Sequence, residues 1–400
     1  MTELSPLPPM SARRTALVGG LMVAAGPLSI SLYGPALPTI VADLGTTAAM
    51  GKLSLSVYFG AFALAQLVCG PLSDSLGRRR VTMVFMALYV LGSLVASLGP
   101  DIAWLLAGRV LQGVGVSVGV ALSRAMVRDQ FEGGESIRIL TLINLILTVA
   151  PAIAPTLGSA LLVVGSWHIL FVVMALYGLG VIALTAWVAR ETHPPERQVA
   201  LRPLAVLGHY RALLGSPAFM LPALILALAF GGFYGFAALL PFVLIDELGL
   251  GTFQFAMVML IQTGAFILGN LVAARLSHGL DGRQMVGVGL VLIVLAGLGF
   301  GLAPRLFPLS VLAVMGPVAL WMLALAFIGP STTAEAMAGF GPIAGAAGAL
   351  TGVFQMGGGF IGSTLAGVLF ADAGSALTVL MPIMAGLTVV VALMGRKRPG

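Results

Sequence analysis

The chain has 400 residues, of which 59% are hydrophobic and only 8% are charged. A soluble surface of this size needs roughly a quarter of its residues to be charged, so this composition excludes a water-soluble globule and indicates a polytopic membrane protein. The formal net charge is +6, but the basic residues are scattered over short connections, which favours a role in topology over nucleic-acid binding. The single cysteine, Cys69, lies in an apolar run, which predicts a packed thiol and excludes an intramolecular disulfide.

Twelve apolar runs are long enough to cross a bilayer, for which a helix needs about 20 mostly apolar residues. Their cores cover residues 15–36, 52–72, 80–98, 102–125, 137–163, 168–189, 217–243, 252–275, 284–303, 308–329, 342–370 and 376–395. The first run follows a polar, Pro-rich segment and has no clear cleavage site, so we expect a retained helix rather than a signal peptide. The expected fold class is an all-α membrane protein with twelve transmembrane helices.

The distribution of Lys and Arg predicts which side of the membrane is cytoplasmic. Of the 20 Lys and Arg residues, Lys52 and Arg305 fall on one side, Arg109 and Arg124 lie inside the fourth run, and the others fall on the opposite side. We therefore expect cytoplasmic N- and C-termini. The predicted domains are a tail (1–14), a six-helix half (15–190), a cytoplasmic central loop (191–216), a second six-helix half (217–395) and a tail (396–400).

The two predicted halves are weakly similar to each other. Residues 72–78 (LSDSLGR) follow the second run and residues 276–283 (LSHGLDGR) follow the eighth, while residues 150–161 (APAIAPTLGSAL) and 357–367 (GGGFIGSTLAG) occupy corresponding places in the fifth and eleventh. Two pseudo-symmetric six-helix halves related by an axis along the membrane normal, with a substrate site between them, resemble the major facilitator fold.

Four motifs strengthen this resemblance. Residues 70–80 (GPLSDSLGRRR) resemble the signature that major facilitator transporters carry between spans two and three, and residues 109–115 (RVLQGVG) resemble the R-x-x-Q-G motif of proton-coupled members. Residues 150–158 (APAIAPTLG) are similar to the antiporter motif, and residues 32–38 (LYGPALP) to the L-Y-x-P-A-x-P motif of twelve-span drug exporters. The chain thus resembles the Bcr/CflA drug-resistance branch over its full length, although these motifs all lie in the N-terminal half. The resemblance implies a multi-pass protein of the bacterial cytoplasmic (inner) membrane.

The charged stretch after the second run combines glycines with an acid. Gly70 and Gly77 permit close helix approach and a tight turn, and Asp74 at a membrane boundary is unfavourable unless it is paired. We therefore expect Asp74, Arg78 and Asp129 to clamp spans two, three and four on the cytoplasmic side, with a bridge to span eleven. A cluster that opens in one conformation is a gate; the alternative is topology charge with a loop turn. The expected gating motif comprises Gly70, Asp74, Gly77, Arg78, Arg79 and Asp129.

Arg109 lies about seven positions inside an apolar helix, where an unpaired guanidinium costs at least about 2.5 kcal/mol. It must therefore face the protein interior and find partners, and Gln112, one helical turn further on, shares its face. We expect Arg109 and Gln112 to influence proton coupling or substrate polarity. The alternative is an arginine that satisfies carbonyls at a helix end, and Arg124, near the cytoplasmic end, is expected to extend toward water.

Pro151, Pro155 and Gly158 interrupt the fifth span. Proline removes a helical hydrogen bond and glycine allows close packing, so we expect a kinked helix that packs tightly against a partner, with span eight as the candidate. A kink without functional consequence is the alternative. The resemblance to antiporters favours a gating helix.

No acidic residue falls in the middle of any span. Many relatives that exchange drugs for protons carry an acid just before the L-Y-x-P element, but residues 25–33 here read AGPLSISLY. Because a carboxylate is the natural group to exchange a proton for a cation, neutral or anionic substrates fit this chain better. Aromatic and amide side chains would then line the cavity, although each of them could instead pack between helices. The candidates are Tyr33, Tyr58, Asn144, Tyr234, Phe236, Gln262 and Gln355.

These features predict a secondary active transporter that exports small amphipathic, mostly neutral compounds, as in drug or antibiotic efflux, by proton antiport with alternating access. A carrier for metabolite uptake or exchange on the same fold is the alternative, which the proline motif disfavours and the missing acid mildly favours. A membrane-embedded enzyme is a third reading, but the four histidines are widely spread and no nucleophile, metal or nucleotide-binding pattern is present. We expect a monomer in the lipid bilayer with a small-molecule substrate and protons as coupling ion, and no cofactor, metal, nucleic-acid partner or enzymatic activity.

Overall fold

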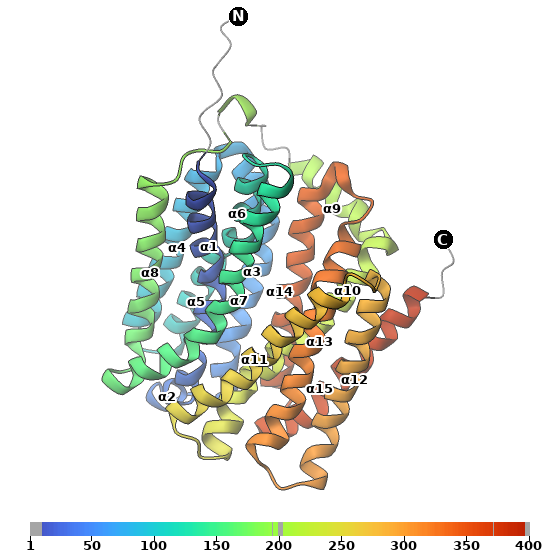
Figure 1. Cartoon of the computed structure of the whole chain (residues 1–400). Coiled ribbons are helices and arrows are strands. Elements are labelled where there is room, and N and C mark those ends of the chain that lie inside the picture. The colour runs from blue at the N-terminus through green and yellow to red at the C-terminus, as the bar shows by residue number, and fades with distance from the viewer. Residues whose placement is uncertain (1–9, 194, 199–202, 371, 397–400) are drawn as a thin grey trace, which may run out of the picture.

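The computed structural model describes residues 10–193, 195–198, 203–370 and 372–396, and within these ranges every regular element is helical (Figure 1). The first half contains α1 (Ala12–Ser31), η1 (Gly34–Ala36), α2 (Leu37–Asp43), α3 (Ala48–Leu76), α4 (Arg78–Leu98), α5 (Ile102–Val116), α6 (Val118–Arg128), α7 (Gly133–Val164) and α8 (His168–Trp187). The connection between the halves contains η2 (Pro195–Arg197) and α9 (Pro203–Leu214). The second half contains α10 (Pro217–Pro241), η3 (Phe242–Glu247), α11 (Thr252–Leu276), α12 (Gly282–Leu306), α13 (Val311–Met337), η4 (Gly341–Ile343), α14 (Ala344–Val368) and α15 (Ala373–Arg396).

These helices form the twelve membrane-spanning segments that the apolar runs predict. Ten segments are long and apolar enough to cross a membrane by length and composition, and the long helices α7 and α14 supply the other two. Three segments are built from more than one element, namely α1 with η1 and α2, α5 with α6, and α10 with η3. The expected all-α, twelve-span fold is therefore confirmed.

Helix ends follow from local chemistry. Asp101 begins α5, where its carboxylate accepts hydrogen bonds from the backbone N–H groups of Ala103 at 2.9 Å and Trp104 at 3.2 Å, because the first N–H groups of a helix have no helical partner. α3 ends at Gly77, whose φ of 92° is open to glycine and unfavourable for other residues. The chain turns there and enters α4 at the next residue.

The central loop differs from expectation because it contains α9, a helix that the apolar-run count does not predict. α9 packs against α10 and α14. Its Tyr210 hydroxyl donates a hydrogen bond to the Leu67 carbonyl of α3 at 2.8 Å. The loop is thus attached to both halves.

Among the described residues, the two halves meet most extensively along two helix pairs. α3 packs along α14, and α7 packs against α11. We call the end of the bundle that holds Arg78 the inner end, because the charge distribution predicts it to be cytoplasmic, and the opposite end the outer end. α7 and α11 approach each other toward the outer end (Figure 1), where the Ser159 hydroxyl donates to the Thr252 carbonyl at 3.0 Å.

Candidate functional site

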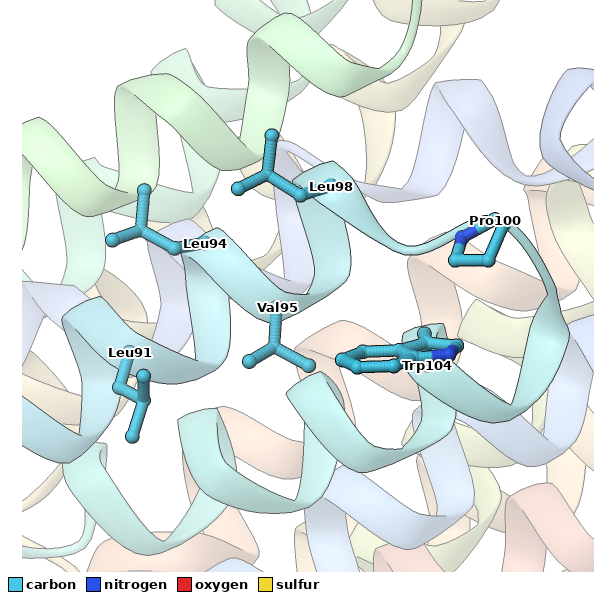
Figure 2. A pocket seen from close by; sticks show the side chains of 6 residues that line it. All are labelled: Leu91, Leu94, Val95, Leu98, Pro100 and Trp104. Carbon is cyan, nitrogen blue, oxygen red and sulfur yellow. The ribbon is translucent and has the colours of Figure 1, made fainter.

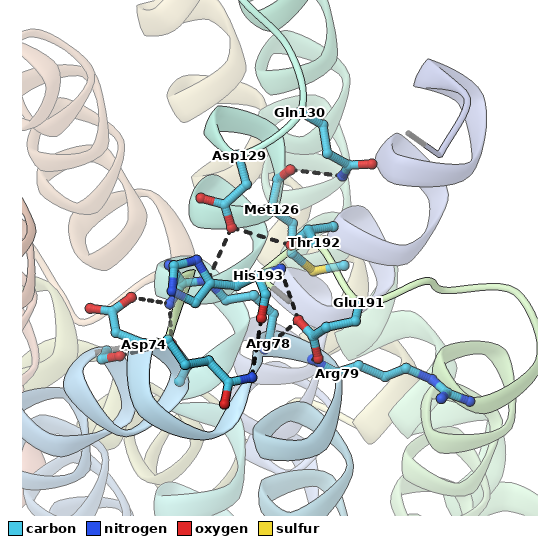
Figure 3. A network of polar contacts seen from close by, with 12 residues as sticks. Asp74, Arg78, Arg79, Met126, Asp129, Gln130, Glu191, Thr192 and His193 are labelled. Carbon is cyan, nitrogen blue, oxygen red and sulfur yellow. Dashed lines mark hydrogen bonds and ion pairs between the residues drawn. The ribbon is translucent and has the colours of Figure 1, made fainter. Parts of the chain in front are cut away.

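Arg78 is the centre of a polar cluster at the inner end (Figure 3). Its guanidinium forms an ion pair with Asp74, four residues earlier on α3, and its Nε lies 3.1 Å from Asp129 Oδ2 at the end of α6. A further guanidinium N–H donates to the Ser73 hydroxyl. The Arg78 side chain is 4% exposed, against 12% for Asp129 and 51% for Asp74. Asp129 is therefore the better-shielded partner, and its attraction is less weakened by water.

The beginning of the central loop completes this inner cluster. Glu191 accepts hydrogen bonds from the backbone N–H groups of Arg78 at 2.8 Å and Arg79 at 3.1 Å, so its carboxylate caps the N-terminus of α4, where the helix dipole favours a negative charge. The Thr192 hydroxyl donates to Asp129 at 3.2 Å (Figure 3). Neither Glu191 nor Thr192 was among the predicted residues; the only sequence signal is that a polar segment follows the sixth span.

Two details of the inner cluster differ from expectation. Among the described residues, the cluster makes contacts with Glu191 and Thr192 and none with span eleven, where the sequence predicts a bridge. A Cβ at Gly70 would meet nothing within 4 Å among the described residues, so Gly70 is not a point of close helix approach in this structure. By contrast, a Cβ at Gly77 would collide with the Glu191 carboxylate. The Arg79 side chain joins α4 to α8 by donating to the carbonyls at positions 185 and 186.

A second polar centre surrounds Arg109, which is fully buried in the first half. Its Nη1 donates to Gln112 Oε1 at 2.9 Å and to the Ser29 carbonyl at 3.3 Å. Ser29 lies in the last turn of α1, where carbonyls lack helical partners and the helix dipole favours a cation. The guanidinium carbon lies 4.7 Å from the ring centroid of Tyr33 and 4.3 Å from that of Tyr58, which are distances of cation–π attraction.

Aromatic rings take the place of a carboxylate around Arg109. Among the described residues, no acidic side chain comes within 4.0 Å of it, and its Nε and Nη2 have no hydrogen-bond partner. The hydroxyls of the flanking rings bond elsewhere, Tyr33 with Ser54 at 2.7 Å and Tyr58 with the Gly26 carbonyl at 3.1 Å. The charge is therefore stabilised by ring faces and by one helix end, and part of its hydrogen-bonding capacity is unused.

Gln112 joins this centre to the neighbouring helices. Its Nε2 donates to the Ser93 hydroxyl of α4 at 2.7 Å and contacts the Met174 sulfur of α8 at 3.4 Å. Since its Oε1 accepts from Arg109, the amide is held by partners on both sides. Arg109 and Gln112 are in contact, as their spacing predicts, and their role in proton coupling stays a prediction.

The fifth span, α7, makes its closest approach within its own half. A Cβ at Gly158 would collide with the Leu32 carbonyl at the end of the first span, so the tight packing at this glycine is against span one rather than span eight. The next residue, Ser159, makes the hydrogen bond to α11. Pro155 is buried, Asn144 is exposed, and the side chain of Pro151 lies outside the described set.

The predicted cavity residues lie in three different settings. Tyr33 and Tyr58 are fully buried against Arg109, and Phe236 is fully buried against Phe300 and Trp321, so in this structure they face packed interior. Gln262 of α11 is 8% exposed with an unpartnered Oε1, and Gln355 of α14 is half-buried. Tyr234 of α10 lies between the halves.

The surroundings of Tyr234 include aromatic residues that the sequence did not single out as cavity residues. Its ring centroid lies 4.3 Å from that of Phe59 on α3, 4.6 Å from Phe233 and 6.1 Å from Phe230. Phe230 and Phe233 are half-buried. A single aromatic residue in an apolar helix carries no sequence signal for such a cluster, because aromatic side chains are equally at home in packed cores and facing lipid.

Lys52, at the start of span two, is buried near the outer end. Its side chain is 2% exposed, and Nζ lies 5.4 Å from the ring centroid of Phe242 in η3. The Ser375 N–H donates to Asp372 at 2.6 Å, and this bond, together with the Lys52 charge, holds the pKa of Asp372 below its ordinary value of 3.8. One turn deeper, the Ser56 and Ser363 hydroxyls share a buried hydrogen bond of 2.8 Å between α3 and α14. First-half and second-half residues thus meet in a buried contact near the outer end.

A groove on the side of the molecule has a different character (Figure 2). It measures about 360 Å³ and lies between α4 and α5 near the outer end. Its lining consists of Leu91, Leu94, Val95, Leu98, Pro100 and Trp104. Several of these side chains are largely exposed, as with Leu98 at 81%. The Trp104 indole N–H is the one polar side-chain group in this lining. A groove with so few groups to orient a ligand fits hydrocarbon better than a specific substrate.

Comparison with known proteins agrees with this architecture. The family description "Major Facilitator Superfamily" matches residues 19–367. The chain belongs to the major facilitator superfamily. This facilitator is therefore a multi-pass membrane transporter for small molecules rather than an enzyme.

Several bacterial relatives share most of the length of this facilitator. An uncharacterized MFS-type transporter, YdgK of Bacillus subtilis (strain 168), is 31% identical over 358 residues, with 87% of each chain covered. Multidrug resistance protein D of Escherichia coli (strain K12) is 27% identical over 371 residues, with 92% of each chain covered. Multidrug resistance protein MdtL of Escherichia coli O81 (strain ED1a) is 33% identical over 177 residues, with 44% of this chain and 45% of the relative covered.

Solved structures show the same fold at low sequence identity. A partially occluded, inward-open structure of the xylose transporter XylE from E. coli has a TM-score of 0.76 at 12% identity, covering 97% of this facilitator and 98% of that chain. The human organic anion transporter MFSD10 has a TM-score of 0.68 at 18% identity, covering 96% and 99%. These likenesses concern the fold and carry no information on substrate.

Proposed function

We propose that the protein exports small amphipathic, mostly neutral compounds across the bacterial cytoplasmic membrane by proton antiport. The observation that carries export is the similarity to multidrug resistance protein D, which extends over 92% of both chains. The motifs in residues 32–38 and 150–158, which resemble those of drug exporters, support the same direction. The proposal places the protein in the Bcr/CflA branch, with a role in antibiotic resistance.

The surroundings of Arg109 support the choice of neutral or anionic over cationic substrates. A buried guanidinium with no acidic partner among the described residues makes the first half electrostatically unfavourable for a second cation. Because Arg109 and Gln112 lie in the motif that resembles the one in proton-coupled members, we place proton coupling at this centre.

Alternating access would involve the two ends of the bundle in turn. The inner cluster of Asp74, Arg78 and Asp129 is the proposed gate at one end, and the buried contact of Lys52 and Ser56 with the second half is the closure at the other. In this proposal the halves 15–190 and 217–395 move as units. The termini and the central loop are cytoplasmic, and the protein is a monomer. A rigid-body motion of this kind exposes one end when it buries the other.

The test is drug accumulation in efflux-deficient bacterial cells that express the protein, measured with and without an uncoupler. We expect the accumulation of some neutral amphipathic compounds to fall on expression and to recover when the uncoupler removes the proton gradient. Export by proton antiport is wrong if no compound shows this pattern. Higher accumulation on expression would instead support the uptake carrier, which the missing acid in span one favours.

A further inference from the structure

Tyr234 differs from the other tyrosines in the state of its hydroxyl. The chain has six tyrosines, and five hydroxyls bond to protein atoms: Tyr33 to Ser54, Tyr58 to Gly26, Tyr89 to Ser29, Tyr177 to Leu21 and Tyr210 to Leu67. No atom in the described part of the chain hydrogen-bonds the Tyr234 hydroxyl. The Tyr234 hydroxyl is therefore available to bond to water or to a bound ligand.

The ring of Tyr234 lies where the two halves meet. It is 7% exposed, and it packs against Phe59 of α3 from the first half at 4.3 Å. On the other side, a Cβ at Gly359 of α14 would lie 2.6 Å from the ring. Tyr234 therefore faces the interior of the protein and not lipid, and relative motion of the halves changes its surroundings.

The hydroxyl reaches accessible surface within this interior. Fully enclosed side-chain atoms without a partner occur at Gln66, Arg109 and Gln262, but the Tyr234 hydroxyl is not one of them. The adjacent rings of Phe230 and Phe233 are half-buried. The helix that carries all three aromatic residues has no Lys, Arg, Asp or Glu between Pro217 and Pro241. The result is an apolar aromatic surface with one hydroxyl that has no partner in the described part of the chain.

We infer that Tyr234, Phe230 and Phe233 form a subsite for an uncharged planar ring with one polar substituent. The phenylalanine rings contact the face or edge of the ligand ring. The Tyr234 hydroxyl donates a hydrogen bond to the polar substituent or accepts one from it. The subsite favours an uncharged ligand, because α10 has no ionised side chain that could pair with a charge on the ligand. This inference rests on the proposed transport function and names the ligand class of its central site.

The binding test compares naphthol with naphthalene, which have the same ring system with and without a hydroxyl. Equilibrium binding of both probes is measured on purified full-length protein, on Tyr234→Phe and on Tyr177→Phe. Tyr177 is the matched control because its hydroxyl already bonds to the Leu21 carbonyl at 2.6 Å. We expect Tyr234→Phe to weaken naphthol binding about fivefold and to leave naphthalene binding unchanged, while Tyr177→Phe leaves the ratio of the two affinities unchanged. An unchanged affinity ratio in Tyr234→Phe, or a wild-type protein that binds neither probe, overturns the inference.

A labelling experiment tests the geometry without a ligand. In a Cys69→Ser background, which has no other thiol, a small thiol reagent is applied to Tyr234→Cys and Phe236→Cys. The first should react and the second, at a fully buried position on the same helix, should not; equal rates at both positions contradict the inference. The two proposals can fail separately. If the uncoupler has no effect on accumulation but Tyr234→Phe still weakens naphthol binding selectively, only proton-driven export is rejected. If drugs are exported and Tyr234→Phe has no effect, only the subsite is rejected.

Discussion

Arg109 shows how a single residue can be placed from sequence while its partners cannot. An arginine deep in an apolar span must face the interior, and it does so with no exposed surface. The residues that stabilise it, Tyr33, Tyr58 and the Ser29 carbonyl, come from two other helices. Residues so far from Arg109 in the sequence become its neighbours only through packing.

The first prediction concerns Arg109→Gln. Because the buried charge has no acidic partner among the described residues and leaves two nitrogens unbonded, removing it relieves an unfavourable burial. We expect the thermal midpoint of the purified protein to stay the same or rise by a few degrees, while transport falls at least about tenfold. Arg124→Gln, at an exposed position on α6, serves as control and should retain transport. A large fall in thermal midpoint for Arg109→Gln would show that the ring contacts outweigh the cost of burial.

The second prediction compares Gly77→Ala with Gly70→Ala. Gly77 has a φ of 92° and faces the Glu191 carboxylate, whereas a Cβ at Gly70 meets no described atom within 4 Å. Gly77→Ala should lower the free energy of unfolding by about 1–2 kcal/mol, and Gly70→Ala should leave it unchanged or slightly higher. Thermal unfolding of both purified variants measures the difference. Equal midpoints would mean that the turn between α3 and α4 relaxes without strain.

At the scale of elements, the inner cluster joins three helices and the central loop. α3 supplies Asp74, α4 supplies Arg78, and Asp129 follows directly after α6. Glu191 then caps α4 from the chain segment that follows α8. The loop that connects the halves therefore contacts the proposed gate directly. A motion of either half would change these contacts.

The third prediction ranks the two acidic residues of this cluster. Asp129 is 12% exposed and Asp74 is 51% exposed, so loss of the Asp129 charge should have the larger effect. We expect Asp129→Asn to reduce the transport rate about tenfold and Asp74→Asn to reduce it several-fold, with normal membrane insertion in both. The double variant should be less impaired than the product of the two effects, because both acids act on Arg78. Normal transport in Asp74→Asn and Asp129→Asn would reduce the motif to a topology signal.

The fourth prediction concerns pH at the outer end. The pKa of Asp372 is held below 3.8 by the Ser375 N–H and by Lys52, so its stabilising contribution is present above that value and is lost only as pH falls through the lower folded-state pKa. Between about pH 5 and pH 8, Asp372→Asn should therefore change the amplitude of transport but not the shape of its pH profile. A shifted profile would assign Asp372 a part in proton coupling.

At the scale of the whole molecule, the halves are joined near the outer end by buried contacts. Ser56 of α3 and Ser363 of α14 share a hydrogen bond of 2.8 Å with no exposed surface on either residue. On the other side of the bundle, Ser159 of α7 bonds to Thr252 of α11. In the proposed transport cycle, opening of the outer end would break both contacts, since each joins one half to the other.

The fifth prediction uses the first of these contacts. In a Cys69→Ser background, Ser56→Cys with Ser363→Cys should form a disulfide under mild oxidation, because the two side chains already touch. The crosslink should stop transport, and a reductant should restore it. Ser56→Cys alone provides the control. Full transport by the crosslinked protein would show that this end does not open during the cycle.

Much of the fold was predictable because the bilayer imposes a strict length and polarity on every span. The spans of about 20 apolar residues, the interior position of Arg109 and the approach of Asp74 and Asp129 to Arg78 all follow from the cost of placing charge in hydrocarbon. The helix α9 was not predicted because it belongs to a connection, where the bilayer imposes no length or polarity on the chain.

The sequence by itself thus determined the twelve spans, the superfamily resemblance and which polar residues needed partners. Only the tertiary structure decided which partners they have: aromatic rings for Arg109, the start of the central loop for Arg78, span one for Gly158, and Phe59 for Tyr234. The physical reason is that hydrophobic patterning is local, whereas contacts between helices depend on how whole faces pack together.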